Sequence, residues 1–327
     1  MGGKHSRKPR GARDRRVVGD SKRLHDAYPV YYVSCSLENP NVPRPVDVYL
    51  GENLSVLKEL PDQSVDLIYI DPPFNTGKTQ SHTRIRTVKD DQGDRTGFQG
   101  TRYQTIKIGT ASYEDSFDDF CAFIEPRLCE ARRLLKPDGS LFFHIDYREV
   151  HYSKVLLDHI FGRACFMNEI VWAYDYGARS KRKWSTKHDN ILWYVKDPKN
   201  YTFNFEEMDR IPYMAPGLVG KEKAARGKTP TDVWWHTIVP TNGKERTGYP
   251  TQKPLGILNR ILKIHTRPGD LVLDFFAGSG TTGEAAARLE RPCILIDQNV
   301  QSMEVIASRL SFADPTFHGW SPQNVKP

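Results

Sequence analysis

A short motif directly after one predicted strand carries the clearest chemical signal of the sequence. Residues 65–70 form an apolar run with one Tyr, and Asp71-Pro72-Pro73-Phe74 follow it. Two consecutive prolines cannot continue a strand ladder, and they fix an extended backbone in which the Pro72 carbonyl projects beside the Asp71 carboxylate. Two neighbouring acceptors match an exocyclic NH2 group, and Phe74 offers a flat face for stacking a base. The motif indicates a site that holds the amino group of a nucleobase.

A glycine loop near the C-terminal end indicates a second site. The predicted strand 271–275 leads into Gly278, Gly280 and Gly283, where a helix is predicted to begin. This is the G-x-G-x-x-G pattern in its strand–turn–helix context. Asp297 lies nineteen residues after Gly278, at the end of the next predicted strand, and can accept hydrogen bonds from ribose hydroxyls. The loop fits a cofactor with an adenosine moiety, either NAD or S-adenosylmethionine.

The elements around both motifs predict a doubly wound, mostly parallel α/β sheet, because strands alternate with helices along the chain. The predicted strands are 46–50, 65–70, 140–145, 169–174, 190–195, 271–275 and 293–296, and the predicted helices are 54–60, 117–135, 150–161, 254–265, 282–289 and 301–310. Ligands of such sheets bind beyond the carboxyl ends of the strands. We therefore expect the two motifs to share one cleft.

The late position of the glycine loop predicts a circularly permuted sheet. Only one strand and one helix fit between Gly283 and the C-terminus, so the rest of the sheet must come from the N-terminal side. The predicted divisions are a disordered basic tail (1–24), a catalytic half (25–196) with basic loops at 78–112 and 177–188, an inserted target-recognition region (197–248), a cofactor-binding half (249–315) and a C-terminal tail (316–327).

Positive charge is concentrated in a few segments. The formal net charge of the 327 residues is +7, and residues 1–24 hold nine basic and two acidic residues, so this tail accounts for all of it. A tail of this composition should be disordered and could hold a polyanion such as DNA. The two basic loops could follow phosphates. The candidate DNA-binding residues of the second loop are Arg179, Lys181, Arg182, Lys183 and Lys187.

Several classes of protein are excluded by composition. No apolar run approaches the roughly 18 residues of a membrane helix, and no secretory signal is visible. The five cysteines are scattered without a C-x-x-C pair, so neither a disulfide framework nor a metal site is expected. A reducing, cytoplasmic setting fits this pattern. His144 and His188 are expected to be structural.

Taken together, the motifs resemble those of the β-type DNA amino-methyltransferases, which form N6-methyladenine or N4-methylcytosine. Residues 71–74 match D-P-P-[YF], residues 276–280 match F-x-G-x-G, and Tyr-Pro-Thr-Gln-Lys-Pro at 249–254 looks like the segment that precedes the cofactor loop. The resemblance covers roughly residues 46–312. Asp71 stands where cytosine-N4 enzymes more often have Ser, which favours adenine.

The resemblance implies S-adenosylmethionine as methyl donor and double-stranded DNA as substrate. It implies that Asp71, Pro72, Pro73 and Phe74 hold a base flipped out of the duplex, and that Lys253 or nearby backbone meets the methionine carboxylate. The implied cofactor-binding residues are Asp274, Phe276, Gly278, Ser279, Gly280, Thr281, Asp297, Thr251 and Lys253. Association with the nucleoid and a homodimer are further expectations, and the sequence does not determine whether a restriction endonuclease partner exists.

Four other readings stay open beside adenine-N6 methylation. They are a cytosine-N4 enzyme, a methyltransferase of RNA or of protein glutamine, a catalytically silent DNA-binding module, and an NAD oxidoreductase. RNA and protein-glutamine enzymes usually place the glycine loop first. The intact Asp71 argues against a silent module, and no separate substrate domain supports an oxidoreductase.

Overall fold

The computed structural model describes residues 46–75, 80–89, 95–96, 102–113, 119–177, 179–240 and 242–321. The predicted basic tail 1–24 lies outside the described residues, as do residues 322–327. Within the described ranges, no helix is both long and apolar enough to cross a lipid bilayer.

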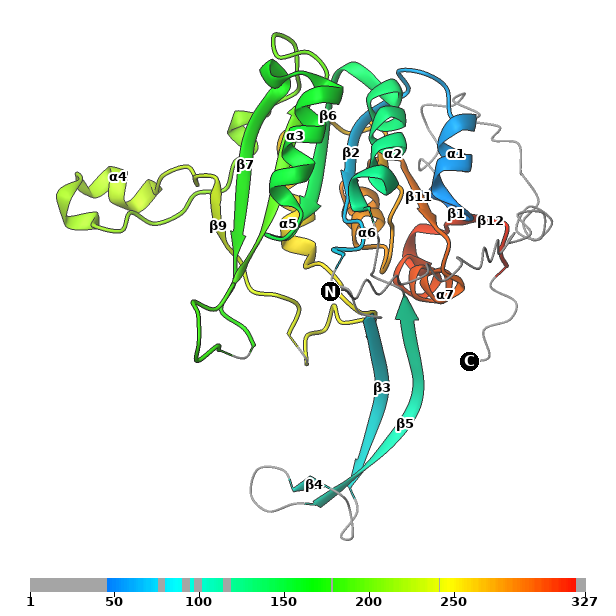
Figure 1. Ribbon diagram of the computed structural model, residues 1–327. Helices are drawn as coiled ribbons and strands as arrows, with labels where there is room; N and C mark the ends of the chain where they lie inside the picture. Colours follow the sequence, from blue (N-terminus) through cyan, green and yellow to red (C-terminus); the bar gives the residue numbers. More distant parts are fainter. Residues whose placement is uncertain are drawn as a thin grey trace, which may run out of the picture. The chain divides into compact units, whose positions relative to one another are not determined.

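A nine-stranded sheet forms the centre of the fold (Figure 1). Its strands are β1 (Val46–Leu50), β2 (Val65–Ile70), β6 (Leu135–Ile145), β7 (Phe166–Ala173), β8 (His188–Val195), β9 (Val233–Trp235), β10 (Val272–Asp274), β11 (Cys293–Asp297) and β12 (Thr316–His318). Their order is β12-β1-β11-β10-β2-β6-β8-β7-β9, and only β8 runs antiparallel to its neighbours. The predicted mostly parallel sheet is confirmed.

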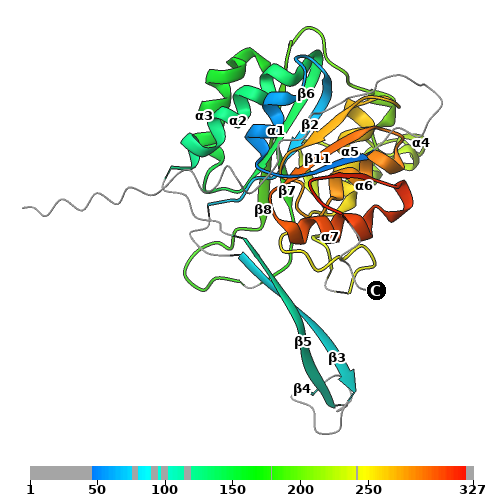
Figure 2. The ribbon, with the colours of Figure 1, turned by 90° about the vertical axis from the view of Figure 1, so that its right-hand side faces the viewer.

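Helices cover both faces of this sheet. They are α1 (Asn53–Glu59), α2 (Phe120–Leu134), α3 (Val150–Phe161), α4 (Lys221–Arg226), α5 (Leu255–His265), α6 (Thr281–Arg288) and α7 (Val300–Arg309). Helices α1, α2 and α3 lie on one face, and α5, α6 and α7 lie on the other (Figure 2). Because both faces are covered, β2 buries Val65 and all four residues from Leu67 to Ile70.

The two sequence motifs follow adjacent strands at the middle of the sheet. Strand β10 pairs in parallel with β2, and Val272 and Leu273 lie opposite Leu67 and Ile68. Strands from the two ends of the chain therefore share one core, which confirms the circular permutation. The strand order reverses between β10 and β2, the position at which open α/β sheets bind their ligands.

Residues 78–112 are not the loop that the sequence predicted. They contain β3 (Gln80–Lys89), β4 (Arg95–Thr96) and β5 (Arg102–Tyr113), which pair antiparallel in a separate sheet of order β3-β5-β4. The sequence contains the reason, because β-branched residues recur at every second position over 83–87 and 106–110. This alternation is typical of a β-ribbon. The many charged residues between the β-branched ones made the segment resemble a polar loop.

Two further predictions of irregular structure were wrong in part. Within region 197–248, β9 pairs with β7 at the edge of the main sheet. The predicted C-terminal tail begins with β12, which pairs with β1. There the His318 ring stacks on Tyr49 at 4.2 Å, and its Nε2 lies 2.9 Å from the Asp47 carboxylate. Both β9 and β12 have only three residues, which is too short for a detectable alternation of apolar and polar residues. Tertiary contacts of this kind fix such short strands.

The third glycine of the loop pattern gives a stability prediction. A Cβ at Gly283 of α6 would lie 2.6 Å from Leu295 Cδ1 of β11 and 3.1 Å from Leu310 Cδ1. We expect Gly283→Ala to lower the free energy of unfolding by about 1–3 kcal/mol through overpacking, although Ala favours helices more than Gly does. Denaturant unfolding measures this change. Gly217→Ala, where a Cβ meets nothing within 4 Å, is the matched control, and equal stability of both variants would contradict the prediction.

Candidate active site

A cavity of about 280 Å³ opens at the carboxyl ends of the central strands. Ten of the residues predicted from the sequence line it: Asp71, Pro73, Thr251, Lys253, Asp274, Phe276, Gly278, Ser279, Thr281 and Asp297. Pro72, Phe74 and Gly280 do not line it. Pro72 is buried, Phe74 packs against the core, and Gly280 packs against Ile306. The structure thus brings the two motifs to one cavity, as expected.

Two carboxylates hold the glycine loop in shape. Asp274, at the end of β10, accepts hydrogen bonds from the Phe276 amide at 3.0 Å and from the Thr282 hydroxyl at 2.6 Å. Asp297, at the end of β11, accepts a hydrogen bond from the Gly278 amide at 2.8 Å. Gly278 has a φ of +51°, and a Cβ there would lie 3.3 Å from the neighbouring tyrosine ring, so only glycine fits well.

Burial changes the protonation of both carboxyl groups. It raises the pKa of Asp274 to about 7 and the pKa of Asp297 to about 6, and the hydrogen bonds that each group accepts offset this only in part. Proton loss from either group is thus less favourable than from an exposed carboxyl group. A cationic ligand in the cavity would favour the ionised form of both.

An ion pair joins the two motifs across the cavity. Lys253 Nζ contacts Oδ2 of Asp71, and both side chains are largely buried. The same ammonium group lies 4.7 Å from the centre of the Phe74 ring. The other oxygen of Asp71, Oδ1, is buried and has no hydrogen-bond partner among the described residues. One acceptor of the carboxylate is thus held by the protein, and the other remains open.

The resemblance implied that Lys253 or nearby backbone meets the methionine carboxylate, and this stays a prediction. The structure places the Lys253 ammonium group on Asp71. The physical reason is that a partly buried carboxylate beside a core strand requires a counter-charge. The Lys253 backbone carbonyl, which accepts a hydrogen bond from Thr281 Oγ1 at 3.1 Å, lies on the glycine-loop side instead.

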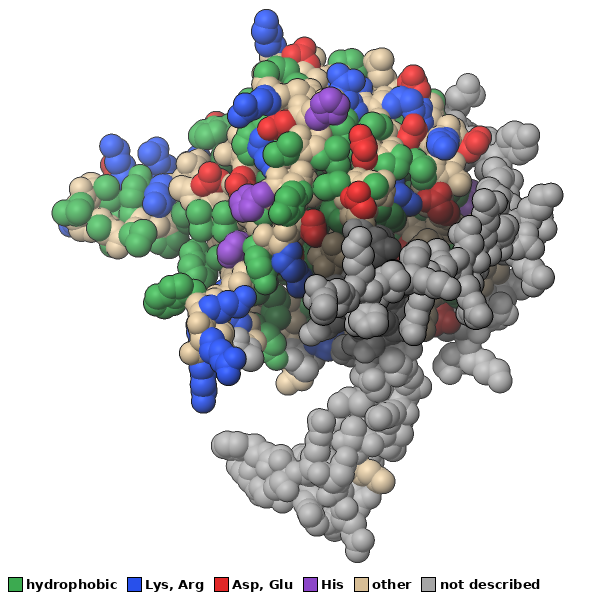
Figure 3. All heavy atoms as spheres, in the orientation of Figure 1, with side chains coloured by type: hydrophobic (Ala, Val, Ile, Leu, Met, Phe, Trp, Pro, Cys, Tyr) green, Lys and Arg blue, Asp and Glu red, His purple; other side chains and the backbone are tan. Residues whose placement is uncertain are grey.

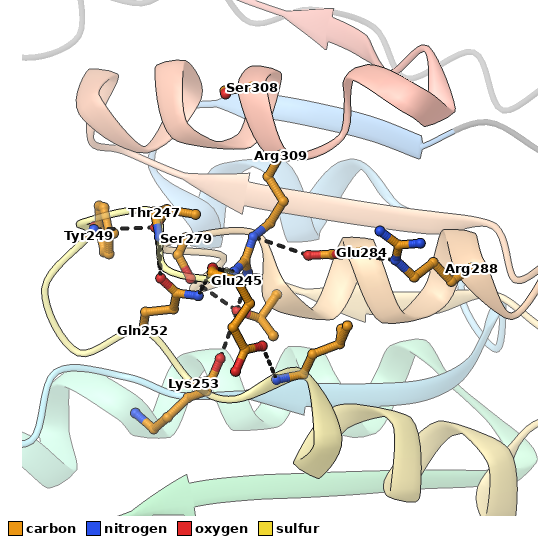
Figure 4. Close-up of polar contacts among 12 residues, drawn as sticks. Glu245, Thr247, Tyr249, Gln252, Lys253, Ser279, Glu284, Arg288, Ser308 and Arg309 are labelled. Atoms are coloured by element: carbon orange, nitrogen blue, oxygen red, sulfur yellow. Dashed lines mark hydrogen bonds and ion pairs between the residues drawn. The ribbon is translucent and has the colours of Figure 1, made fainter. Parts of the chain in front are cut away.

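The segment Glu245–Lys253 forms one wall of the cavity and is braced from within (Figure 4). The Gln252 side-chain oxygen accepts hydrogen bonds from the Thr247 amide at 2.8 Å and from its hydroxyl at 2.9 Å. The Gln252 amide group donates to the Glu245 carbonyl at 2.7 Å. Thr251 has a φ of +57°, which is unfavourable for a β-branched residue and is held by this bracing.

Arg309 of α7 fastens this wall to the rest of the site. Its guanidinium donates to the Glu245 carbonyl at 3.1 Å, contacts the Thr281 hydroxyl, and lies 3.3 Å from the Glu284 carboxylate (Figure 4). Its side chain is only 3% exposed. Three separate segments therefore meet at one arginine. The sequence analysis did not single out this residue, because nothing in the local pattern marks it.

Further residues that the sequence analysis missed line the cavity on the side of α1 and α2. Asn53 donates to the Phe275 carbonyl at 2.8 Å and accepts a hydrogen bond from Arg127 Nε at 2.7 Å. Phe123 packs 6.1 Å from the Phe276 ring. Asn53 follows β1 directly, so the rule that ligands bind beyond strand ends could have identified it.

The predicted DNA-binding loop leaves the same edge of the sheet as Asp71. It follows β7, which runs parallel to β2, and basic side chains gather there (Figure 3). Ser180 and Ser185 close a turn, because the Ser180 amide donates to Ser185 Oγ at 2.7 Å. The four residues between them are exposed, namely Lys181, Arg182, Lys183 and Trp184. Arg179 pairs with Asp175, and Lys187 donates to the Tyr176 carbonyl.

Comparison with known proteins agrees with this geometry. A family model described as DNA methylase matches residues 65–308, which is more than half of the chain. The chain belongs to this DNA methylase family. The family resemblance predicted from the motifs is confirmed.

Two curated relatives and one solved structure illustrate the family. The type II methyltransferase M.HpaI of Haemophilus parainfluenzae is 31% identical over 267 residues, which cover 82% of this chain and 74% of the relative. The DNA adenine methyltransferase YhdJ of Escherichia coli (strain K12) is 31% identical over 276 residues, which cover 80% of this chain and 82% of the relative. The structure of the M1.HpyAVI–SAM complex has a TM-score of 0.53 at 22% identity and covers 81% of this chain and 98% of that chain. This likeness confirms the predicted fold, and S-adenosylmethionine is confirmed as the cofactor at the level of the family.

The raised pKa of Asp274 gives a prediction of pH-dependent stability. The unfolded chain loses this proton near the ordinary pKa of 3.8, whereas the folded chain keeps it until about pH 7. In that window the folded state binds more protons, so the Asp274 contribution to stability falls as the pH rises, by something on the order of 4 kcal/mol in total.

Denaturant unfolding of the wild type and of Asp274→Asn from about pH 4 to 8 measures this contribution. Because Asn does not titrate, the stability of the wild type relative to the variant should fall up to about pH 7 and then remain constant. Glu59→Gln, at an exposed position of α1, is the control substitution. A pH-independent difference between the wild type and Asp274→Asn would show that Asp274 is ionised throughout.

Proposed function

We propose that this DNA methylase transfers the methyl group of S-adenosylmethionine to N6 of an adenine flipped out of double-stranded DNA. The observation that carries the proposal is the Asp71 carboxylate. Its Oδ2 is paired with Lys253, and its Oδ1 is buried at the cavity and meets no donor in the part of the chain that the structure describes. A buried carboxylate oxygen without a partner is costly, and an amino group entering the cavity supplies the missing donor.

The residues of the cavity suit the cofactor. When bound, S-adenosylmethionine supplies an electrophilic methyl group on a sulfonium sulfur. The buried carboxyl groups of Asp274 and Asp297 ionise more readily beside this cation. Asp297 lies at the end of β11, where it would accept hydrogen bonds from ribose hydroxyls, and Thr251, which lines the cavity on the wall Glu245–Lys253, would contact the methionine end.

The chain's own residues then prepare the amino group. Asp71 Oδ1 accepts one N6–H and the Pro72 carbonyl accepts the other, so that the nitrogen becomes more pyramidal and its lone pair less delocalised. Fixed acceptors stabilise the positive charge that develops on nitrogen, and they require no reorganisation. Phe74, held beneath the Lys253 ammonium group, supplies the stacking face. Orientation supplies most of the acceleration, and no covalent enzyme intermediate is needed.

Adenine is favoured over cytosine by two observations. The motif begins with Asp71 where Ser is more common in cytosine-N4 enzymes, and the E. coli relative at 31% identity is named as an adenine methyltransferase. Cytosine-N4 methylation is the second candidate, because the same pair of acceptors can hold N4 of cytosine. Either base must leave the duplex stack to reach the cavity.

Positive charge supports a DNA-binding surface at the same edge of the sheet. Lys181, Arg182 and Lys183 are exposed at the tip of the loop after β7, and Trp184 beside them is 97% exposed. The basic residues would contact phosphates, and the aromatic ring would contact a base or sugar. Region 197–248, which contains α4 and β9, would read the target sequence.

Methylome sequencing tests the reaction and the base together. We expect N6-methyladenine in one sequence context in DNA from a methylation-free host that expresses the wild type. Asp71→Asn should lower this methylation by about a hundredfold or more, because the amide replaces a charged acceptor, while calorimetry still shows cofactor binding. N4-methylcytosine would overturn the adenine assignment, and the absence of any modified base would overturn the proposed function.

The tip of the basic loop should contribute to DNA affinity. We expect the triple variant Lys181→Ala/Arg182→Ala/Lys183→Ala to bind duplex DNA more weakly and to show a shallower dependence of affinity on salt, by up to about 0.9 in the log–log slope per lost phosphate contact. Fluorescence anisotropy at several salt concentrations measures both.

The matched control removes three exposed basic residues from the opposite edge of the sheet, with the triple variant Lys58→Ala/Arg132→Ala/Lys199→Ala. Its net charge changes equally, so an equal loss of affinity in both variants would mean that overall charge, and not the loop, binds the DNA.

A further inference from the structure

A chain of four hydrogen-bonded side chains lies buried behind the proposed base site. The Tyr69 hydroxyl lies 2.7 Å from His144 Nδ1, and His144 Nε2 lies 3.3 Å from Asp189 Oδ2. Tyr174 donates to the other oxygen of Asp189 at 3.1 Å. His144 has no exposed surface. The methyl transfer described above uses none of these groups.

The inner end of this chain reaches the cavity. Tyr69 precedes Asp71 by two residues on β2, so the two side chains leave the same face of the strand, and both line the cavity. The His144 ring, on the neighbouring strand β6, lies 5.9 Å from the Phe74 ring. On its other side, Trp172 contacts it edge-on at 5.5 Å. The chain therefore starts at the proposed methyl-transfer site and crosses the neighbouring strands β2, β6 and β8 to the end of β7.

The hydrogen bonds of the chain have one preferred direction. Burial raises the pKa of Asp189, but the hydrogen bonds from His144 and Tyr174 and the charge of Lys253 lower it below its ordinary value, so Asp189 is ionised. An ionised carboxylate accepts the Nε2–H of His144, which leaves Nδ1 as an acceptor. Burial also raises the pKa of Tyr69 well above its usual value, so its hydroxyl keeps its proton and donates to Nδ1.

We infer that Tyr69, His144 and Asp189 take up the proton that the amino nitrogen loses on methylation. The inference rests on the proposed function. As the N–CH3 bond forms from the nitrogen lone pair, the S–CH3 bond breaks and its electrons stay on sulfur. The nitrogen then carries two N–H bonds, and the one that leaves the Pro72 carbonyl breaks towards the Tyr69 oxygen while the Tyr69 proton moves to His144 Nδ1. The resulting imidazolium faces the ionised Asp189, and the proton returns to water after the product leaves.

The chemical reason for such an acceptor lies in Asp71. That carboxylate already holds the Lys253 ammonium group and is assigned to orient the amino group, so a separate acceptor lets it remain charged throughout. Tyr69 is the member that contacts the reacting atoms. His144 and Asp189 act through it, in the way that a carboxylate supports an imidazole in acid–base relays.

Other titratable groups surround the chain. Tyr69 faces Asp71, Asp274 and Asp189, and Asp189 faces Lys253. At the outer end, Tyr174 lies near Asp146 and Arg148. Because the proposed relay moves two protons, we expect a solvent isotope effect on methyl transfer.

Tyr69→Phe and Tyr174→Phe form the matched pair that tests the relay. Both remove one hydroxyl from the chain, but only Tyr69 lines the cavity. Single-turnover methylation is measured with labelled S-adenosylmethionine on a duplex that carries the sequence found in the methylome, in ordinary and in heavy water.

We expect Tyr69→Phe to slow methyl transfer about a hundredfold and to abolish the solvent isotope effect. Its affinities for cofactor and DNA should not change, and Tyr174→Phe should retain the wild-type rate and isotope effect.

A wild-type rate and isotope effect in Tyr69→Phe would overturn the inference. Thermal melting shows whether Tyr69→Phe has a folding defect. If it has one, Asp189→Asn is used instead, because it removes the charge that stabilises the imidazolium. A wild-type rate in Asp189→Asn would also overturn the inference. The proposed function fails separately, if the wild type leaves no modified base in the DNA of the host. An inactive Asp71→Asn together with an unaffected Tyr69→Phe would overturn the relay alone.

Discussion

The ion pair between Asp71 and Lys253 is the constraint on which the rest of the site depends. It joins residues 182 positions apart, one after β2 and one before α5, and both side chains are largely buried. A buried carboxylate is tolerated only when it is paired, and the pair here satisfies a single oxygen. The other oxygen has no hydrogen-bond partner among the described residues, so it is available to a donor that enters the cavity.

The sheet provides the frame for this pair. Because β10 and β2 are hydrogen-bonded neighbours, their carboxyl ends deliver the glycine loop and Asp71 to the same edge, although 201 residues of the chain lie between the two strands. The loop is then fixed by Asp274 and Asp297, whose raised pKa values reflect carboxyl groups placed where water is excluded. A site built in this way is most complementary to a ligand that carries positive charge.

The opposite wall is less regular and is held by side chains. Gln252 braces the segment Glu245–Lys253 internally, and Arg309 ties it to α6 and α7. Such polar networks in a buried setting fix one geometry only when every member is satisfied. Helix α7, near the C-terminus, thus positions this wall of the cavity. The proposed reactive residue of the same cavity, Asp71, follows β2 near the N-terminal end of the fold.

The sequence alone determined the motifs, the α/β class and the reversed order of the halves, since these follow from local pattern: an apolar run before Asp71, a glycine turn before α6, and strand–helix alternation. Tertiary structure alone decided the partner of Lys253, the role of Arg309 and the chain from Tyr69 to Asp189. Each of these joins separate segments of the chain, and no short-range pattern records which buried polar groups meet when a sheet is assembled.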